Sequence, residues 1–581
     1  MEKFRKPSEE RIWEKYYSKQ ALTAKIPEMT MYEYALSCNT EYMDQVIVKY
    51  YGNDMTYNDF FKSECATDNA AAAFKKAGIK KGDRVSLCSL SIPEVYYAIY
   101  ALNKIGAVTN AFDPRASDQI VEHFLNESKS TYLIMLDALF PKFAGLLGKT
   151  SIKKVIIVSP FDSLPKIKRS ILTSQAKQKQ LTNDIYSDKS SYISWNEFAS
   201  SGSGYKGKVA EAYEKDSLAF IVHTGGTTGI PKGVGLSNEA FNACNILYTL
   251  SGMEYYRNEP YLHVMPPWIA YSFNRFHLTM IEGMPAVIIP KFEPEELPKL
   301  LIKNKIAHFV GVPVNIETIM NSEEFCKKGK KHTRSLCVGG DYLGPTVEEN
   351  ANKFLASINP RYKCYKGYSL SELGSATIVS SYVNNKFGSP GIPVAQYNMK
   401  IINPDNGEEL GYNESGEICL TGPSMMLSYE NNPEATDAIK KIDENGVAWI
   451  KTGDRGYIDE DGFLFIEGRY KRIIVTHDSF KIFPFSIENI ITSHQAVSQC
   501  AVVGIRDIEH AHGQKPIAHI VLKPEYKGSE QSIEDEIKKL CFDSALDSYA
   551  YPVKYIFRDS FPLTLIGKID HDTMEAENNT Y

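Results

Sequence analysis

A glycine- and threonine-rich loop is the part of this sequence best suited to bind phosphate. The loop runs from Thr224 to Gly233, follows the apolar run Phe220 to Val222 and has Lys232 near its end. Small residues let backbone N–H groups turn toward an anion, the threonine hydroxyls add donors, and the lysine adds a mobile positive charge. A nucleotide triphosphate would suit such a loop. It is not a Walker A motif, because Pro231 precedes the lysine and a glycine follows it, and by composition alone the loop is more often a simple turn.

Four further motifs follow along the chain, and they favour a phosphate-binding loop over a simple turn. They are Gly367-Tyr368-Ser369-Leu370-Ser371-Glu372, Thr452-Gly453-Asp454, Gly468-Arg469-Tyr470-Lys471 and Pro562-Leu563-Thr564-Leu565-Ile566-Gly567-Lys568. With the loop, they resemble in type and order the motifs of the acyl-adenylate-forming superfamily of AMP-dependent synthetases and ligases. That superfamily includes acyl-CoA synthetases, aryl-CoA ligases, peptide-synthetase adenylation domains and beetle luciferase. Because the matches span nearly the whole chain, the protein is identified as a member, similar to the acyl-CoA synthetases.

The resemblance implies ATP-dependent activation of a carboxylic acid. A carboxylate is a poor electrophile, so the acid is first joined to AMP as a mixed anhydride and its acyl group is then passed to coenzyme A. Such catalysis depends on positioning and on preorganised positive charge around the transferring phosphoryl group. The implied enzyme is an AMP-forming carboxylate–CoA ligase, and its expected cofactors and substrates are ATP, Mg²⁺, coenzyme A and a fatty or aryl acid.

The resemblance also implies roles for single residues. Glu372 is the expected Mg²⁺ ligand, since Mg²⁺ prefers hard carboxylate oxygens. Lys568 is expected to bridge the acid and the α-phosphate, because a flexible ammonium can follow charge that builds up between them. Together with Thr227 these are the expected catalytic residues. Asp454 would accept hydrogen bonds from the ribose, and Tyr368 offers a flat face to the adenine. The expected ATP- or AMP-binding residues are Thr224, Gly225, Gly226, Thr228, Gly229, Lys232, Gly340, Asp341, Tyr342, Gly367, Tyr368, Ser371, Asp454, Arg469 and Lys481.

The acid pocket is expected between Val264 and Ser369. Its expected lining is Trp268, Tyr271, Gly311, Val312 and Ser369. Ser369 replaces the usual glycine but is small, whereas acetate-specific relatives place a large aromatic side chain there, so a deeper pocket is implied. Amino-acid-activating relatives hold the ammonium group with an aspartate, and none occurs between Trp268 and Phe273. The sequence therefore favours an uncharged fatty or aryl acid.

The segment after the expected hinge departs from most CoA ligases. Lys471 occupies the hinge position, and the following stretch Val475 to Lys481 has no glycine. Most relatives have a Ser-Gly or Lys-Gly there, and a Cβ would narrow the path of the pantetheine thiol. Either the loop takes another path that admits coenzyme A, or the acyl acceptor is a carrier protein or an amine.

Two less favoured functions are compatible with the same motifs. The first is an inactive nucleotide-binding or sensor protein, and the second is an oxygenase of the luciferase type. Four retained residues argue against the inactive reading, namely Lys232, Glu372, Asp454 and Lys568.

The elements that position these residues are expected to be parallel α/β layers. Apolar runs at 84–88, 131–135 and 154–158 alternate with helix-like segments. Residues 1–467 are expected to form a large N-terminal AMP-binding portion with several subdomains. Short strands at 473–475, 501–505 and 517–522, and a helix with Ile533, Ile537, Leu540 and Cys541 on one face, predict a small mobile α+β domain over 468–581, with its hinge near Lys471. The Ser- and Lys-rich segment 162–208 is expected to be exposed to solvent, with a membrane or partner contact as the alternative.

Composition is that of an ordinary globular protein. The 581 residues are 43% hydrophobic and 23% charged, which suits two or three domains. The net charge of −6, without a basic stripe, argues against nucleic-acid binding. Ten cysteines without a Cys-x-x-Cys pair indicate a reducing compartment. The most apolar window, 92–112, contains Glu94 and Lys104 and fits a packed helix and strand better than a bilayer span. A cytoplasmic enzyme without a transmembrane segment is expected, and its oligomeric state is left open.

Overall fold

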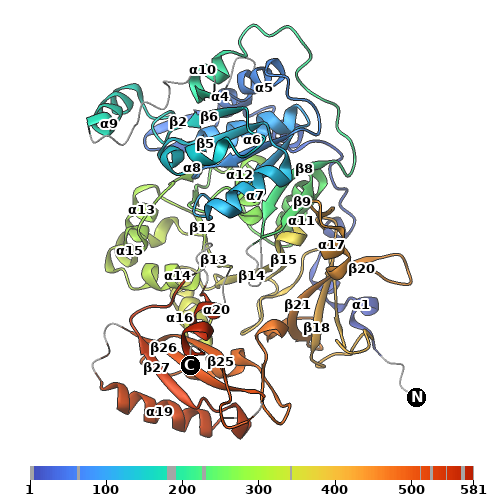
Figure 1. The fold of residues 1–581 in the computed structure, drawn as a ribbon, viewed down its shortest axis with the longest axis vertical. Helices are drawn as coiled ribbons and strands as arrows, with labels where there is room; N and C mark the ends of the chain where they lie inside the picture. The colour runs from blue at the N-terminus through green and yellow to red at the C-terminus, as the bar shows by residue number, and fades with distance from the viewer. Residues whose placement is uncertain are drawn as a thin grey trace.

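The structure is a computed structural model. It describes residues 5–61, 66–178, 191–224, 231–340, 343–510, 512–523, 526, 528–544, 546–563 and 569–579. In this part of the chain, two large sheets and their helices form the upper body in Figure 1, a smaller antiparallel sheet lies beside it, and a C-terminal module lies below.

The first large sheet carries the phosphate-loop motif. Its order is β19-β9-β8-β4-β3-β5-β6-β7. The strands are β3 (Arg84–Cys88), β4 (Val108–Ala111), β5 (Tyr132–Leu136), β6 (Lys154–Val158), β7 (Tyr192–Ser194), β8 (Leu218–His223), β9 (Gly233–Ser237) and β19 (Ser428–Tyr429). The run from β8 to β7 is parallel, whereas β9 pairs antiparallel with both β8 and β19. The three strands predicted from apolar runs are present, with the second shifted by one residue.

The second large sheet carries the motif that ends in Glu372. Its order is β16-β15-β14-β13-β12-β10-β11-β1-β2. The strands are β1 (Val46–Tyr50), β2 (Asn53–Thr56), β10 (Tyr261–His263), β11 (Ala286–Ile288), β12 (His308–Gly311), β13 (Ser335–Val338), β14 (Tyr365–Ser369), β15 (Ala376–Val379) and β16 (Ile392–Pro393). From β1 through β11, β10, β12 and β13 to β14 the pairing is parallel. The expected mixed α/β fold with parallel layers is therefore confirmed.

Buried helices join the two sheets into one core. Helix α6 (Pro93–Lys104) is buried from Pro93 to Asn103, and its Tyr96 stacks at 3.6 Å on Phe276 of α12 (Ala270–Glu282). The apolar window at 92–112 is thus a packed helix followed by β4, as expected. Within the described residues, no helix is long and apolar enough to cross a membrane.

The remaining helices cover the sheets and connect the strands. They are α1 (Pro7–Glu10), α2 (Lys19–Leu22), α3 (Met31–Ser37), α4 (Tyr57–Phe61), α5 (Ala66–Lys76), α7 (Asp118–Ser128), α8 (Phe140–Leu147), α9 (Lys166–Gln178), α10 (Trp195–Ser200), α11 (Asn238–Leu250), α13 (Leu297–Lys303), α14 (Pro313–Met320), α15 (Glu323–Lys328), α16 (Pro345–Ala356) and α17 (Pro433–Ile439). The single-turn 3₁₀ segments are η1 (Ile12–Tyr16), η2 (Asp137–Leu139), η4 (Pro294–Glu296), η5 (Lys330–His332) and η6 (Ser371–Leu373).

The segment 162–208, expected to be exposed to solvent, is exposed only in part. Helix α9 is exposed, and Ile167 on it is 78% exposed. Beyond it, however, β7 joins the edge of the first sheet, and α10 buries Trp195 and Phe198. The aromatic residues three positions apart on α10 share one helical face, and this apolar face packs into the body despite the polar composition around it.

The third sheet is antiparallel and presents the Thr-Gly-Asp motif. Its strands are β17 (Asn398–Ile402), β18 (Gly416–Thr421), β20 (Lys440–Ile442), β21 (Ala448–Ile458) and β22 (Leu464–Arg469). Strand β22 pairs with β21 as far as Arg469, after which the 3₁₀ turn η7 (Tyr470–Arg472) leads out of the sheet. The chain therefore leaves this sheet beside Lys471, while the domain boundary at 467/468 stays a prediction.

The C-terminal module is a small α+β unit with its own core. Its elements are β23 (Ile474–Val475), β24 (Lys481–Ile482), α18 (Pro484–Thr492), β25 (Val497–Arg506), β26 (Gln514–Leu522), α19 (Glu530–Phe542), η8 (Ser548–Ala550), β27 (Lys554–Arg558) and α20 (His571–Asn578). Helix α19 buries Ile533, Ile537 and Cys541, the face predicted from its spacing, whereas Leu540 is half-buried. The small α+β C-terminal part is confirmed.

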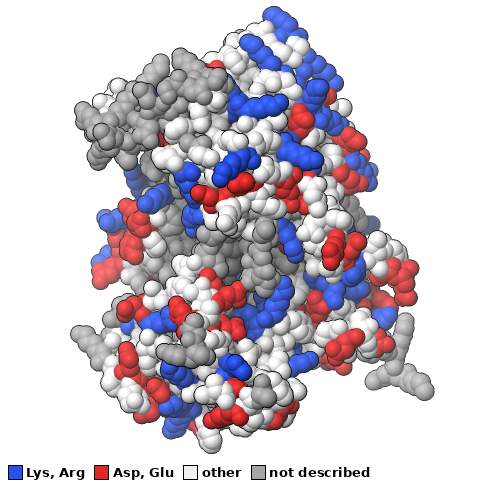
Figure 2. Space-filling view, in the orientation of Figure 1, with Lys and Arg blue, Asp and Glu red and all other residues white. Residues whose placement is uncertain are grey.

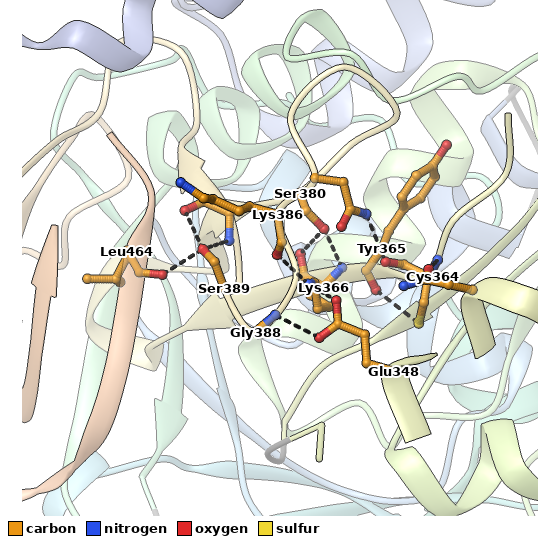
Figure 3. Close-up of polar contacts among 12 residues, drawn as sticks. Glu348, Cys364, Tyr365, Lys366, Ser380, Lys386, Gly388, Ser389 and Leu464 are labelled. Atoms are coloured by element: carbon orange, nitrogen blue, oxygen red, sulfur yellow. Dashed lines mark hydrogen bonds and ion pairs between the residues drawn. The ribbon is translucent and has the colours of Figure 1, made fainter. Parts of the chain in front are cut away.

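Strand β14 is held by a buried ion pair (Figure 3). The Lys366 ammonium contacts the carboxylate of Glu348 on α16, and the two side chains are 7% and 1% exposed. The lysine also donates to the Lys386 carbonyl at 2.9 Å, and the Gly388 N–H donates to Glu348 at 3.1 Å. Burial lowers the pKa of Lys366, an effect that Glu348 opposes. The pair thus ties β14, α16 and the loop at 386–389 together, two residues before Tyr368.

Candidate active site

The phosphate loop lies in a β-hairpin between β8 and β9. At its base, the N–H of Thr224 donates to the carbonyl of Lys232 at 3.0 Å, and the Thr224 hydroxyl donates to the same oxygen at 3.4 Å. The antiparallel pair β8–β9 therefore brings the two ends of the loop together. The loop residues Gly225, Gly226, Thr227, Thr228 and Gly229 lie outside the described residues.

One tyrosine contacts both the phosphate-loop lysine and the expected metal ligand. The hydroxyl of Tyr429 donates to Oε1 of Glu372 at 2.6 Å. The Nζ atom of Lys232 lies 5.0 Å from the centroid of the same ring. Tyr429 reaches this position because β19 pairs with β9, placing it opposite Val234. Burial raises the pKa of Tyr429, and Glu372 raises it further, so the phenol is a hydrogen-bond donor at neutral pH.

Sequence reasoning missed Tyr429. It is one of 36 tyrosines, and nothing in its neighbourhood marks it as a site residue. Only the pairing of β19 with β9 shows its position.

Glu372 has the properties of a magnesium ligand. It lies in η6, which begins two residues after the end of β14, and its carbonyl accepts a hydrogen bond from the N–H of Met426 at 2.8 Å. Its carboxylate is half-buried, and Oε2 accepts no hydrogen bond from a described residue. A fixed carboxylate with one uncommitted hard oxygen suits Mg²⁺, which takes its remaining ligands from phosphate and water. Ser371 precedes it and is also half-buried.

Asp454 is the centre of a second polar group. Its Oδ1 lies 2.8 Å from Nε of Arg469, which faces it across the β21–β22 pair, and its Oδ2 accepts a hydrogen bond from the hydroxyl of Tyr368. The residue is 3% exposed. Burial and the nearby carboxylate of Asp454 raise the pKa of Tyr368. Three residues predicted from separate motifs therefore lie together, and the tyrosine ring is oriented through its hydroxyl.

Two of the predicted acid-pocket residues, Gly311 and Ser369, lie at one edge of the second sheet. Gly311 ends β12 and Ser369 ends β14, so in this parallel arrangement both lie at the carboxyl ends of their strands, where α/β sheets bind ligands. Gly340, at φ +84°, follows β13 at the same edge. Trp268 is buried, Tyr271 is half-buried, and Val312 is 39% exposed at the start of α14. Asp341 and Tyr342 lie outside the described residues.

Family models match both parts of the chain. Residues 37–430 match the model described as AMP-binding enzyme, and residues 486–568 match the AMP-binding enzyme C-terminal domain.

The chain belongs to the AMP-binding enzyme family.

Curated relatives of this AMP-binding enzyme are CoA ligases by name. It is 28% identical over 551 residues to a long-chain-fatty-acid–CoA ligase of Bacillus subtilis (strain 168), with 94% of each chain covered. It is 29% identical to a probable 4-coumarate–CoA ligase 1 of Dictyostelium discoideum, over 90% of this chain and 91% of the relative. The superfamily assignment made from the motifs is confirmed.

Solved structures agree on the fold. An anthranilate CoA ligase, AuaEII, in complex with anthranoyl-AMP has a TM-score of 0.80 at 18% identity, covering 95% of this chain and 98% of the other. The amide bond synthetase McbA of Marinactinospora thermotolerans has a TM-score of 0.75 at 19% identity, covering 94% and 99%.

The last predicted site residues are three lysines in the C-terminal part of the chain, Lys471, Lys481 and Lys568. In this AMP-binding enzyme Lys471 lies in η7 and is exposed, and Lys481 begins β24, where it is exposed and makes no ion pair or hydrogen bond with a described residue. Lys568 lies outside the described residues. The roles of these three lysines remain predictions.

Proposed function

We propose that this AMP-binding enzyme is an AMP-forming carboxylate–CoA ligase acting on a fatty or aryl acid. The observation that carries the proposal is that Lys232 and Glu372, predicted to bind phosphate and Mg²⁺, contact one tyrosine, Tyr429. A positive charge and a metal-binding carboxylate side by side suit a triphosphate. The named long-chain-fatty-acid and 4-coumarate ligases among its relatives support the acid class.

The proposed reaction has two displacements. A carboxylate oxygen of the acid attacks the α-phosphorus of ATP, the bond from that phosphorus to the bridging oxygen breaks, and pyrophosphate leaves with the electron pair. The sulfur of coenzyme A then attacks the acyl carbon, its proton passes to solvent, and AMP leaves. When bound by Glu372, Mg²⁺ would neutralise phosphate charge.

The side chains of this enzyme position and neutralise the reactants in this proposal. In the proposal the Lys232 ammonium, beside the Tyr429 ring, faces the phosphates, and Asp454, which contacts Arg469 and Tyr368, accepts hydrogen bonds from the ribose. Lys568 is proposed to bridge the acid and the α-phosphate. Preorganised charge of this kind lowers the barrier because little reorganisation is needed during the reaction.

An alternative acceptor, a carrier protein or an amine, remains the second candidate. The glycine-free stretch from Val475 to Lys481 favours it. In the structure this stretch is the β23–β24 hairpin, and Ser479 adopts φ +65° there, so a serine takes the left-handed position that glycine adopts most easily. A cytoplasmic location is part of the proposal.

A product assay tests the proposal. The protein is incubated with Mg-ATP, coenzyme A and a mixture of fatty, aryl and bile-type carboxylic acids, and the products are identified by mass spectrometry. We expect AMP and one or a few acyl-CoA thioesters. Acyl adenylate without acyl-CoA would favour the alternative acceptor, and the absence of AMP with every acid would contradict both.

A further inference from the structure

A buried arginine without an acidic partner lies in the region expected to hold the acid. Arg275 is on α12, one helical turn after Tyr271, and is 0% exposed. Its Nη2 donates to Oδ1 of Asn274 at 3.3 Å, whereas Nε and Nη1 have no hydrogen-bond partner in the described part of the chain. A guanidinium stays protonated in proteins, and a buried charge without a paired anion strongly destabilises a fold.

Aromatic rings surround this guanidinium. Its carbon lies 4.1 Å from the ring centroid of Tyr248 and 5.1 Å from that of Tyr271. Burial lowers the pKa of Arg275, but four nearby tyrosines, Tyr271 and Tyr248 foremost, leave it raised. Tyr261, one of the four, is buried, and its hydroxyl has no hydrogen-bond partner among the described residues. Ring faces stabilise a cation, but they accept hydrogen bonds from N–H groups only weakly.

The arginine also lies close to the strands that carry the expected pocket residues. Tyr248 and Tyr261 belong to one hydrophobic cluster with Val310 of β12 and Cys337 of β13, and Tyr271 packs against it. Val310 directly precedes Gly311. The Arg275 guanidinium and Tyr261 therefore lie beside the strands whose carboxyl ends carry the expected acid residues, and Tyr261 is at the opposite, amino end of β10.

We propose, on the basis of the ligase function above, that Arg275 and Tyr261 bind an anionic group at the far end of the substrate. The preferred substrates are then dicarboxylic fatty or aryl acids, of which one carboxylate is activated and the other pairs with Arg275. A carboxylate is the usual partner of a buried guanidinium. This proposal replaces the expectation of an uncharged acid. That expectation rested on the stretch from Trp268 to Phe273, which ends two residues before Arg275.

Matched pairs of substrates test the proposal. The value of kcat/KM for acyl-CoA formation is measured for monocarboxylic and dicarboxylic acids over a series of chain lengths. We expect the wild-type enzyme to favour the dicarboxylic acid by at least about tenfold at one or more lengths, since a site built for a polar group rejects the analogue that lacks it. Arg275→Met should reverse the preference. The control Arg257→Met, which removes an arginine that pairs instead with Asn39 and Gln45, should keep it.

If Arg275→Met does not fold, the substrate preference of the wild-type enzyme is sufficient to test the inference. A preference for monocarboxylic acids at every length, with acyl-CoA still formed, would overturn the inference and leave the ligase function standing. A protein that forms no AMP with any acid would overturn both.

Three side chains in the C-terminal module, independent of Arg275, lie close enough together to share one ligand. His477 lies in the β23–β24 hairpin, and Asp507 and His510 lie in the turn between β25 and β26. One ligand atom from each lies within 4.8 Å of the others. Oδ2 of Asp507 is 2.8 Å from Nδ1 of His510 and 3.6 Å from Nδ1 of His477, and the two imidazoles stack at 3.5 Å.

The surrounding contacts hold this group in place. Asp507 is 1% exposed, and its Oδ1 accepts from Lys515 at 3.2 Å and from the N–H of Glu509 at 3.1 Å, which leaves Oδ2 toward the imidazoles. At Gly513 a Cβ would lie 2.3 Å from the backbone nitrogen of His477, so the two loops are closely packed.

We infer that His477, Asp507 and His510 form a binding site for a divalent transition metal such as Zn²⁺. Two imidazole nitrogens and one carboxylate oxygen match the ligands of zinc, and three protein ligands leave one position open for water. An ordinary ion-pair network is the competing reading, because His477 also contacts Asp478 at 2.8 Å. The metal would join the glycine-free hairpin to the β25–β26 turn.

Metal titration of the full-length protein tests this site. Chelator-treated protein is titrated with Zn²⁺ by calorimetry and with Co²⁺ by visible absorption, alongside His477→Ala, His510→Ala and the control His512→Ala. His512 is exposed nearby but is not part of the group. We expect one site per chain that weakens at least about tenfold in the first two variants and is unchanged in the third. Wild-type affinity in His477→Ala and His510→Ala, or no binding by the wild type, would overturn the inference.

Discussion

The hydroxyl of Tyr429 donates a hydrogen bond of 2.6 Å to the carboxylate of Glu372, 57 residues away in the sequence. The same ring lies 5.0 Å from the Lys232 ammonium. The phosphate-loop hairpin and the segment after β14 therefore meet at one side chain. This relationship links the two parts of the enzyme that we propose handle phosphate and metal.

Tyr429→Phe tests this link. The change removes the hydrogen bond to Glu372 and keeps the ring beside Lys232. A hydrogen bond to a charged group contributes about 1.5–3 kcal/mol, so we expect adenylation to slow roughly 10- to 100-fold and the Mg²⁺ requirement to rise. Pyrophosphate exchange at several Mg²⁺ concentrations measures both. Tyr382→Phe, a change at a tyrosine that is 39% exposed, serves as the control, and an unchanged Mg²⁺ dependence in Tyr429→Phe would contradict the link.

Asp454→Asn should weaken nucleotide binding. The variant keeps the shape of the side chain but loses the charge that pairs with Arg469 at 2.8 Å. We expect the KM for ATP to rise about tenfold or more, with a smaller change in the KM for the acid. Steady-state kinetics with each substrate varied in turn measures the split. Asp405→Asn, at an exposed turn, is the control. Equal changes in both KM values would argue against a ribose-binding role.

Lys568→Ala should separate binding from chemistry. If this lysine bridges the acid and the α-phosphate, its loss removes charge that acts mainly in the transition state. We expect ATP binding close to that of the wild type and the loss of most adenylate formation. Calorimetry with ATP and the pyrophosphate-exchange rate measure the two effects, with Lys554→Ala, an exposed lysine on β27, as the control. An unchanged exchange rate would refute the assignment.

Glu94→Gln should flatten the dependence of stability on pH. Burial, with a smaller contribution from the nearby carboxylate of Asp162, raises the pKa of Glu94 to about 8, although a hydrogen bond from Ser163 opposes the shift. The folded state binds the proton of the Glu94 carboxyl more tightly than the unfolded state does. The wild type therefore loses on the order of a few kcal/mol of stability as pH rises from about 4.5 to about 8.

Thermal unfolding measures this effect. The Tm of Glu94→Gln relative to the wild type should increase steadily from pH 5 to pH 8. Glu295→Gln, at an exposed position, should follow the wild-type profile. Parallel profiles for Glu94→Gln and the wild type would show that Glu94 does not titrate in this range.

Motifs formed by residues close together in the chain could be predicted from sequence. The phosphate loop joins two strands of a hairpin because apolar strands flank small residues, and Ser371 and Glu372 lie in the turn that begins two residues after β14. The ordered motifs were sufficient to assign the superfamily, and the strand runs to assign the fold class. The domain boundary and the roles of Lys471, Lys481 and Lys568 remain predictions.

The tertiary structure alone decided which distant side chains meet. Tyr429 reaches Glu372 through the pairing of β19 with β9, and Asp454 meets Arg469 through the register of β21 and β22. No local pattern encodes such contacts, because strand pairing joins segments regardless of their separation in the chain. Burial is likewise a property of the whole fold, so nothing in the sequence marked Arg275 as a buried guanidinium that lacks an acidic partner among the described residues. The chemistry of each motif could therefore be predicted from the sequence, whereas the neighbours and burial of each side chain depend on tertiary packing.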